Sequence, residues 1–256
     1  MRLVEALRYR VERRMRPLPT PIADDDFDWR TYNDTYRRQI AEMEQSLTSR
    51  LAPGDARLEG DVLRLRDGLP PLHPNHRVLY ETVMLLEPDG VIEAGCGGGD
   101  HLHNLSTLLP DVDLRGLDRS AEQLAFAQER NPELVDRVRH ADLTLPLPTS
   151  IEPADVAYTQ AVVMHIKTGN GHRVALTNLF RLARRQVVLM ENWGEHDFMA
   201  DIQALYRLDV LGWEDLHLYV RRSPEMGDAP HIMVASRVPL DWEPLEDYGT
   251  LRSTVR

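Results

Sequence analysis

The spacing of hydrophobic and polar positions changes near residue 75. Before that point, apolar side chains mostly recur every three or four residues, as they do on the buried face of a helix. After it, short runs of consecutive apolar residues alternate with segments of helical spacing. Because a strand covered on both faces is apolar throughout, this alternation predicts a doubly wound, mostly parallel α/β sheet. We therefore expect a mainly helical N-terminal cap over residues 1–74 and an α/β domain over residues 75–256.

The predicted cap contains three patterned segments. Residues 1–16 hold six arginines, and apolar residues fall four apart from Leu3 to Met15. This pattern favours a basic amphipathic helix docked on the protein or on a partner, with peripheral contact to an anionic membrane as the alternative. Residues 29–51 have the spacing of a second helix. Residues 55–68 (DARLEGDVLRLRDG) alternate around a Glu-Gly-Asp turn, which predicts a small hairpin.

Seven apolar runs after residue 75 predict strands, and five segments of helical spacing predict helices. One helix has a clear start signal, because Ser120 precedes it and is a favoured N-cap residue. The predicted strands are 91–95, 113–118, 137–142, 154–160, 186–193, 216–222 and 231–238. The predicted helices are 76–87, 101–109, 120–130, 171–184 and one that follows Asp197.

Composition narrows the class of protein. A length of 256 residues suits one large domain with an appendage, and no run approaches the ~18 consecutive apolar residues of a membrane span. A net charge of −11 disfavours a nucleic-acid partner, because phosphate neutralisation supplies most of that affinity. With a single cysteine, Cys96, and no secretory signal pattern, we expect a cytoplasmic protein.

The stretch VIEAGCGGGD, residues 91–100, places four glycines at the end of a predicted strand. A dinucleotide fingerprint would require a third glycine at position 100 or 102, but these positions hold Asp100 and Leu102. Asp100 would also place a negative charge where a diphosphate enters the helix N-terminus. The turn therefore favours a ligand that lacks a diphosphate and carries a cationic group.

The segment Glu93-Ala94-Gly95-Cys96-Gly97-Gly98-Gly99 resembles the first motif of the class I S-adenosylmethionine-dependent methyltransferases, an acidic residue followed by Gly-x-Gly-x-Gly. The resemblance implies a Rossmann-like, seven-stranded methyltransferase fold with S-adenosylmethionine as cofactor. It also implies that Gly95, Gly97 and Gly99 let the backbone approach the methionine part of the cofactor. Glu93 would support the turn and the cofactor's amine.

Later segments extend the resemblance to about residues 75–237. It implies that Asp118 binds the ribose hydroxyls and that Arg119 beside it joins the cofactor site. Asp142 lies where the family has an acidic residue near the adenine amino group, and Leu143 where it has an apolar neighbour of the ring. Gln160 stands at the tip of the fourth strand, which resembles the family's fourth motif.

His165 follows that strand by five residues, in a loop where the family commonly places catalytic residues. An imidazole titrates near neutral pH and can take a proton from a hydroxyl nucleophile, so we expect His165 to be the general base of an O-methyltransferase. N-methylation or carboxyl methylation of a small molecule remains open, as do a nicotinamide-dependent oxidoreductase with a degenerate glycine turn and a non-catalytic binding module. The tetrapeptide [Asp/Asn]-Pro-Pro-[Tyr/Phe] of many amine-directed relatives is replaced by TQAV.

The predicted fifth strand leads into ENWGEHDF, which supplies the candidate substrate-binding residues Glu191, Trp193 and His196. Carboxylates and an imidazole so close together suit Mg²⁺ or Mn²⁺, but ligands this close in sequence rarely complete an octahedral shell, so no metal ligand is assigned. We expect a small-molecule or saccharide acceptor and keep a homodimer open.

Overall fold

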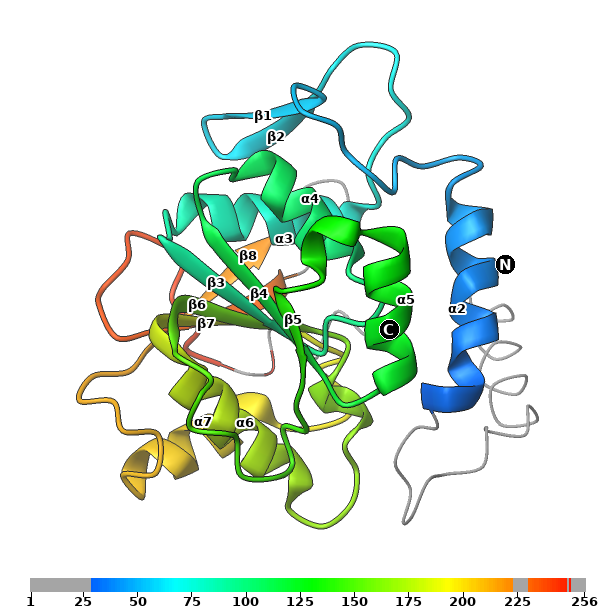
Figure 1. Cartoon of the computed structure of the whole chain (residues 1–256). Coiled ribbons are helices and arrows are strands. Elements are labelled where there is room, and N and C mark those ends of the chain that lie inside the picture. The colour runs from blue at the N-terminus through cyan, green and yellow to red at the C-terminus, as the bar shows by residue number, and fades with distance from the viewer. Residues whose placement is uncertain (1–28, 223–229, 248, 250–256) are drawn as a thin grey trace, which may run out of the picture.

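The computed structural model describes residues 29–222, 230–247 and 249, and its centre is a seven-stranded sheet (Figure 1). The strand order is β5-β4-β3-β6-β7-β9-β8, and the first five of these strands run parallel. β9 is antiparallel to both of its neighbours, β7 and β8. The bounds are β3 Gly90–Ala94, β4 Asp113–Asp118, β5 Val138–His140, β6 Ala154–Gln160, β7 Ala183–Met190, β8 His217–Arg222 and β9 Pro230–Ser236. The predicted seven-stranded, mostly parallel sheet is confirmed.

Helices cover both faces of this sheet, and alternate residues of a strand enter different cores. On β3, Ile92 packs in the cluster that contains residues of α6 and α7, whereas Val91 packs in the cluster that contains residues of α3. Figure 1 shows α3 and α4 on one side of the sheet and α6 and α7 on the other. The helices are α3 Pro74–Leu85, α4 Asp100–Leu108, α5 Ala121–Arg130, α6 Gly171–Leu182 and α7 Phe198–Arg207, with 3-10 turns η1 Pro132–Leu134 and η2 Val163–His165.

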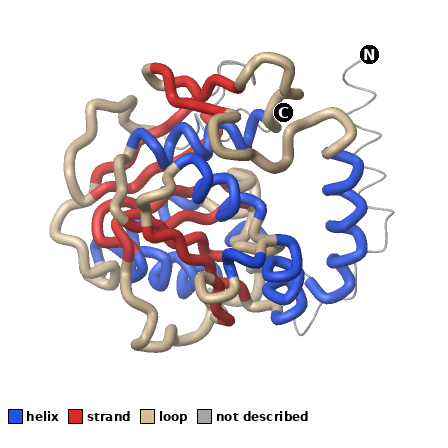
Figure 2. The backbone as a smooth tube through the Cα atoms, turned by 45° about the horizontal axis from the view of Figure 1, so that its top comes forward, coloured by secondary structure: helices blue, strands red, loops and turns tan. Residues whose placement is uncertain are grey.

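The described part of the predicted cap consists of α2 (Trp29–Met43) and a hairpin of β1 (Ala56–Glu59) and β2 (Val62–Leu65). Figures 1 and 2 both show α2 lying alongside α5. Arg37 of α2 pairs with Glu129 of α5 at 3.1 Å, and its guanidinium lies 3.7 Å from the ring centre of Phe126. Leu51, Leu63 and Leu72 share an apolar cluster with α3 and the sheet, so this segment has no separate core. Residues 1–16, the predicted amphipathic helix, lie outside the described residues.

Several predicted elements are shorter in the structure than in the sequence pattern, and α2 and β7 show why. α2 ends at Met43, although helical spacing continues to residue 51, because the backbone turns away to pair with a later segment. Thr48 donates its N–H to Pro71 and its hydroxyl to Pro70, and a bridge joins Thr48 to Leu72. β7 ends at Met190, where its pairing with β6 ends, and the predicted strand residues 191–193 enter a loop.

No helix among the described residues is both long enough and apolar enough to cross a bilayer.

Candidate active site

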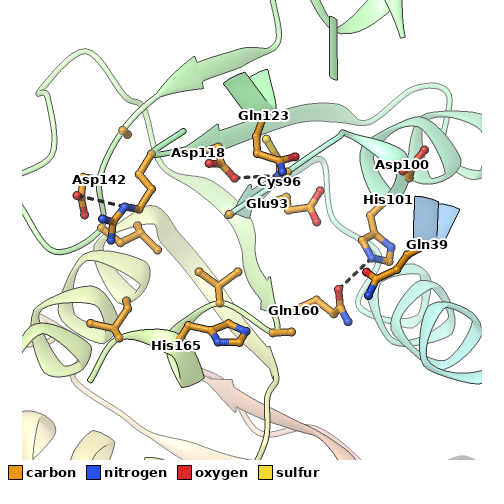
Figure 3. A pocket seen from close by; sticks show the side chains of 18 of the residues that line it. Gln39, Glu93, Cys96, Asp100, His101, Asp118, Gln123, Asp142, Gln160 and His165 are labelled. Atoms are coloured by element: carbon orange, nitrogen blue, oxygen red, sulfur yellow. Dashed lines mark hydrogen bonds and ion pairs between the residues drawn. The ribbon is translucent and has the colours of Figure 1, made fainter. Parts of the chain in front are cut away.

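A cavity of about 500 Å³ opens at the carboxyl ends of the parallel strands β3, β4 and β6 (Figure 3). This is the edge at which open α/β sheets bind their ligands. The α/β domain supplies most of the lining, and α2 closes one side with Gln39, Ile40 and Met43. Of the residues predicted to bind the cofactor, the lining includes Glu93, Gly95, Gly97, Asp118, Arg119, Asp142, Leu143 and Gln160, together with the predicted base His165.

The glycine turn after β3 is fixed by close packing as much as by its conformation. Gly95 has φ = 84°, and a Cβ at this position would overlap the side chain of Val162. Gly99 precedes α4 with φ = 77°, and a Cβ there would lie 2.8 Å from Leu134. Gly95 and Gly97 line the cavity, whereas Gly99 is not among the residues that line it. Gly99 therefore contributes by bringing α4 close to the neighbouring segments.

Glu93 is the most deeply buried acidic group of the cavity, with an exposed fraction of 2%. Its Oε2 has no hydrogen-bond partner among the described residues. Burial raises the pKa of Glu93 well above its ordinary value; the neighbouring Tyr158 hydroxyl acts against this shift, and Asp118 and Asp100 add to it. A buried carboxylate that lacks a full set of partners is a site for a cation or a hydrogen-bond donor.

Asp118 ends β4 and holds the glycine turn from the side. Its Oδ2 accepts the N–H of Gly97 at 2.9 Å, and its Oδ1 accepts the N–H of Ser120 at 2.8 Å. Burial raises the pKa of Asp118, although both backbone donors oppose that shift. Since each carboxylate oxygen can accept more than one hydrogen bond, Asp118 retains capacity for ligand hydroxyls.

The far end of the cavity is formed by the segment after β5. Asp142 accepts the N–H and the hydroxyl of Thr144 through Oδ1, while its Oδ2 lies 3.9 Å from Nε of Arg119. Leu143 is buried beside them, with an exposed fraction of 6%, and also lines the cavity. This combination of an apolar surface and a carboxylate suits a planar heterocycle that carries an amino group.

His165 ends η2 and faces the cavity from the side of β6 (Figure 3). The loop that carries it is held by Glu191, whose carboxylate accepts the backbone N–H groups of Val162, Val163 and Met164 and the hydroxyl of Thr159. Burial raises the pKa of Glu191, and these four donors act against that shift. Glu191 therefore holds the η2 loop in place without itself lining the cavity.

The structure does not bring the three predicted substrate-binding residues to the cavity. Glu191 is 8% exposed and is occupied with the η2 loop, and Trp193 is 3% exposed and packs edge-on against Phe198. The ring of His196 is stacked on His172, with 4.2 Å between their centres. The prediction placed them by their position after a strand; their side chains instead enter the core and the loop contacts.

Several cavity residues escaped the sequence prediction, chiefly His76 on α3 and His101 on α4. The two imidazoles meet edge to face, with 4.6 Å between ring centres. Asp100 also lines the cavity, but its Oδ1 pairs with Arg130 at 2.8 Å, so its charge is largely offset. No local motif connects these residues; only the packing of α3 against α4 could have revealed them.

The donors and acceptors around the cavity fit S-adenosylmethionine. The bare turn at Gly95 and Gly97 admits a ligand close to the backbone, Glu93 offers a buried oxygen without a partner, and Asp118 offers further acceptor capacity. A cationic amine and two ribose hydroxyls match these groups in charge and in hydrogen bonding. Among the described residues, no group of three or more His, Cys, Asp or Glu side chains is arranged to hold a metal ion.

The fold and this site have the features expected of a class I methyltransferase. Residues 91–186 match the family model described as "Methyltransferase domain". The chain therefore carries a methyltransferase domain over residues 91–186, on a sheet of the Rossmann-like methyltransferase type, and the alternative of a nicotinamide-dependent oxidoreductase is not supported. No curated protein sequence matches the chain.

Solved structures match the chain at low sequence identity. A TehB-like S-adenosylmethionine-dependent methyltransferase from Corynebacterium glutamicum is 17% identical, with 84% of this chain and 99% of that one covered and a TM-score of 0.52. The magnesium protoporphyrin IX methyltransferase of Synechocystis, with bound S-adenosylmethionine, is 19% identical, with 64% and 80% covered and a TM-score of 0.43. DesVI of Streptomyces venezuelae is 18% identical, with 46% and 49% covered and a TM-score of 0.40, so the match spans about half of that protein.

Proposed function

We propose that the protein methylates a hydroxyl oxygen of a small-molecule acceptor, with His165 as the general base. The observation that carries the proposal is the position of His165, which lines the same cavity as the glycine turn and stands on a loop fixed by Glu191. A hydroxyl nucleophile requires a base held in place beside it, since the proton of the hydroxyl must leave as the new bond forms.

Different residues along the cavity would bind different parts of the cofactor and the acceptor. S-adenosylmethionine, when bound, supplies an electrophilic methyl group on a sulfonium. Asp142 and Leu143 would hold the adenine, Asp118 the ribose hydroxyls, and Glu93 the amine. His165 would accept the proton of the acceptor hydroxyl, and the η2 loop would keep the imidazole in place throughout.

The acceptor's chemistry is inferred from the other side of the cavity. Ile40 and Met43 of α2 offer apolar contacts there, and His76 and His101 offer uncharged polar ones, because burial lowers the pKa of each imidazole. Such a surface favours a neutral, partly apolar compound that carries a hydroxyl, and a cavity of about 500 Å³ favours a small one. A single saccharide unit remains compatible with this volume.

An amine or carboxylate acceptor is the alternative within the same class. A neutral amine needs only its lone pair exposed and would be independent of His165, and a carboxylate is already ionised at neutral pH. The requirement for a base therefore separates the hydroxyl acceptor from both alternatives.

The test is a methyl-transfer assay with matched compounds that differ only in a hydroxyl, amino or carboxyl group on one ring. We expect the hydroxyl compound to be methylated and His165→Ala to lower kcat by about 10²- to 10⁴-fold, the usual contribution of a general base. Alkaline pH should partly restore the rate of the variant. His217→Ala on β8, at the far edge of the sheet, is the control. Turnover of only the amine, or unchanged kcat in His165→Ala, would contradict the proposal.

Partners and location remain predictions. The helix predicted in residues 1–16 lies outside the described residues, and liposome co-sedimentation with and without that segment tests the membrane alternative. A homodimer and a cytoplasmic location are proposed on the sequence alone.

A further inference from the structure

A chain of buried hydrogen bonds runs from the segment after α2 to the wall of the cavity. It passes through Asn104, Tyr80, His101 and Gln160, which come from α4, α3, α4 and β6. Asn104 and Tyr80 are fully buried. Because water cannot complete their hydrogen bonds, each proton in the chain must have an acceptor within it.

The backbone fixes the first member. Asn104 accepts the N–H of Leu51 through Oδ1 at 2.8 Å and donates from Nδ2 to the carbonyl of Ser49 at 2.8 Å. A backbone N–H can only donate and a carbonyl can only accept, so the amide of Asn104 has one possible orientation. Its second Nδ2 hydrogen then goes to the hydroxyl oxygen of Tyr80 at 2.9 Å.

That contact decides the proton of Tyr80 and the tautomer of His101. The Tyr80 oxygen already accepts from Asn104, and the other group in reach is Nδ1 of His101 at 3.0 Å. The hydroxyl therefore donates to Nδ1, which must be unprotonated, and the proton of the neutral ring lies on Nε2. Burial lowers the pKa of His101, which keeps the ring neutral.

The tautomer in turn decides the orientation of Gln160. Nε2 of His101 lies 3.2 Å from Oε1 of Gln160, as the dashed line in Figure 3 marks, and donates to it. In the reversed orientation, the NH₂ group of Gln160 would face the protonated Nε2 of His101, and both groups are hydrogen-bond donors. The Gln160 side chain lines the cavity, so its NH₂ group is the end left to meet a ligand.

We propose that this series of hydrogen bonds orients the amide of Gln160 so that its NH₂ group donates to an oxygen of a bound ligand. His101 is the positioning residue. The part of this inference that concerns the methyl acceptor rests on the proposed function. Two oxygens could meet this donor: the oxygen of the methyl acceptor or the carboxylate of the cofactor's amino acid. Either would find an uncharged surface, because His76 against His101 also stays neutral, with its pKa lowered by burial to about 2.

The first experiment observes the tautomer directly. In the full chain labelled with ¹⁵N-histidine, long-range ¹H–¹⁵N correlation at neutral pH should show His101 protonated on Nε2 alone, with His101→Gln identifying the signals. Tyr80→Phe removes the donor to Nδ1 and should produce a mixture of tautomers. Tyr219→Phe is the matched control: it removes a buried hydroxyl that accepts the N–H of Leu240 at the β8 edge of the sheet, and should leave the spectrum unchanged.

The second experiment identifies the ligand oxygen. Gln160→Glu keeps an acceptor for His101 but replaces the NH₂ group with an oxygen. If the cofactor's carboxylate is the partner, this variant should bind S-adenosylhomocysteine at least about tenfold more weakly, with unchanged affinity for 5′-methylthioadenosine, which lacks the amino acid. If the acceptor is the partner, S-adenosylhomocysteine affinity should hold while kcat/KM for the hydroxyl compound falls about tenfold or more. Gln128→Glu on α5 adds the same charge away from the cavity and is the control.

Either loss supports the inference and assigns the oxygen. A His101 ring protonated on Nδ1 overturns it, as does a Gln160→Glu variant in which both quantities equal those of the wild type. The NMR experiment requires no turnover. A failure to find a hydroxyl acceptor would therefore contradict the proposed function while the fixed tautomer could still be confirmed or refuted.

Discussion

At the scale of single residues, two carboxylates of the cavity, Glu93 and Asp118, have raised pKa values. Glu93 is buried, one of its oxygens has no partner among the described residues, and its pKa is raised by burial and by Asp118 and Asp100. In the absence of a ligand, part of the Glu93 population therefore keeps its proton above the ordinary pKa. A cation entering the site favours the ionised form, because an opposite charge nearby lowers a carboxyl pKa.

Cofactor binding should consequently release a proton from Glu93. The sign follows from the raised pKa: between its ordinary value and its raised value the free protein is protonated, and the complex with a ligand ammonium is ionised. Affinity for S-adenosylhomocysteine should therefore rise with pH through this range. Calorimetry in two buffers of different ionisation enthalpy measures the released proton. Glu93→Gln should abolish the release, and identical heats in both buffers with the wild type would refute the expectation.

How far the sequence predicts individual residues depends on whether their role is local. Gly95 and Asp118 could be placed because a turn and a strand end are read from neighbouring residues, and both line the cavity. Glu191 could not, because its partners are backbone N–H groups 27 to 29 positions away. His101 depends on Tyr80 and Gln160, which are 21 and 59 positions away. No sequence pattern specifies these contacts.

At the scale of elements, the short η2 turn follows β6 and carries His165 to the cavity. Ala161, between β6 and this turn, has φ = 56°, and Val162 packs into the space that Gly95 leaves. The N–H groups of Val162, Val163 and Met164 lie at the start of the turn, before its own backbone hydrogen bonds, and Glu191 supplies their acceptors. A carboxylate next to a strand end thus caps the turn.

Glu191→Gln tests this role. The amide keeps one acceptor oxygen but points its NH₂ group at backbone donors, so we expect a loss of about 1–3 kcal/mol of unfolding free energy. Because His165 is carried by the same turn, kcat should fall as well, with little change in cofactor affinity. Glu81→Gln on α3 is the matched control, since that carboxylate also accepts a buried backbone N–H, from Leu63, away from the cavity. Equal kcat losses in the two variants would contradict a specific role for Glu191.

The elements themselves were largely predictable where apolar runs are buried on both faces. β3, β4 and β6 lie within one residue of their expected bounds, because their residues are buried in parallel pairing. The end of α2 was mispredicted by eight residues, since helical spacing in residues 44–51 also suits the turn that packs Leu51 against α3. Periodicity reports which side chains are buried, and a partner across the fold decides whether the backbone stays helical.

At the scale of the whole molecule, charged side chains fasten the segment after α2 to the α/β domain. Arg130 at the end of α5 pairs with Asp100 at the start of α4 at 2.8 Å and with Glu44 after α2 at 3.4 Å. Arg50 adds hydrogen bonds to Asn131 and His103. Since Ile40 and Met43 of α2 line the cavity, the same contacts keep one wall of the active site in place.

Arg130→Met should therefore lower both stability and ligand affinity. The side chains of Arg130 and Asp100 are 20% and 9% exposed, so removing the arginine leaves a nearly buried carboxylate without its closest partner. We expect a loss of about 2–4 kcal/mol of unfolding free energy in urea, near the lower end of values for broken buried pairs because Arg50 lies 4.0 Å from the same carboxylate. Arg57→Met, whose pair with Glu59 is 80% and 45% exposed, should cost less than about 1 kcal/mol.

The double variant Arg130→Met with Asp100→Asn distinguishes the lost ion pair from lost packing. Asparagine removes the uncompensated charge, so it should recover part of the stability if the buried carboxylate is the cause. Affinity for S-adenosylhomocysteine should stay low in the double variant, because Glu44, directly after α2, still lacks its link to α5. Full recovery of affinity would show that the wall formed by α2 does not depend on Arg130, and that the charge of Asp100 alone had disturbed the site.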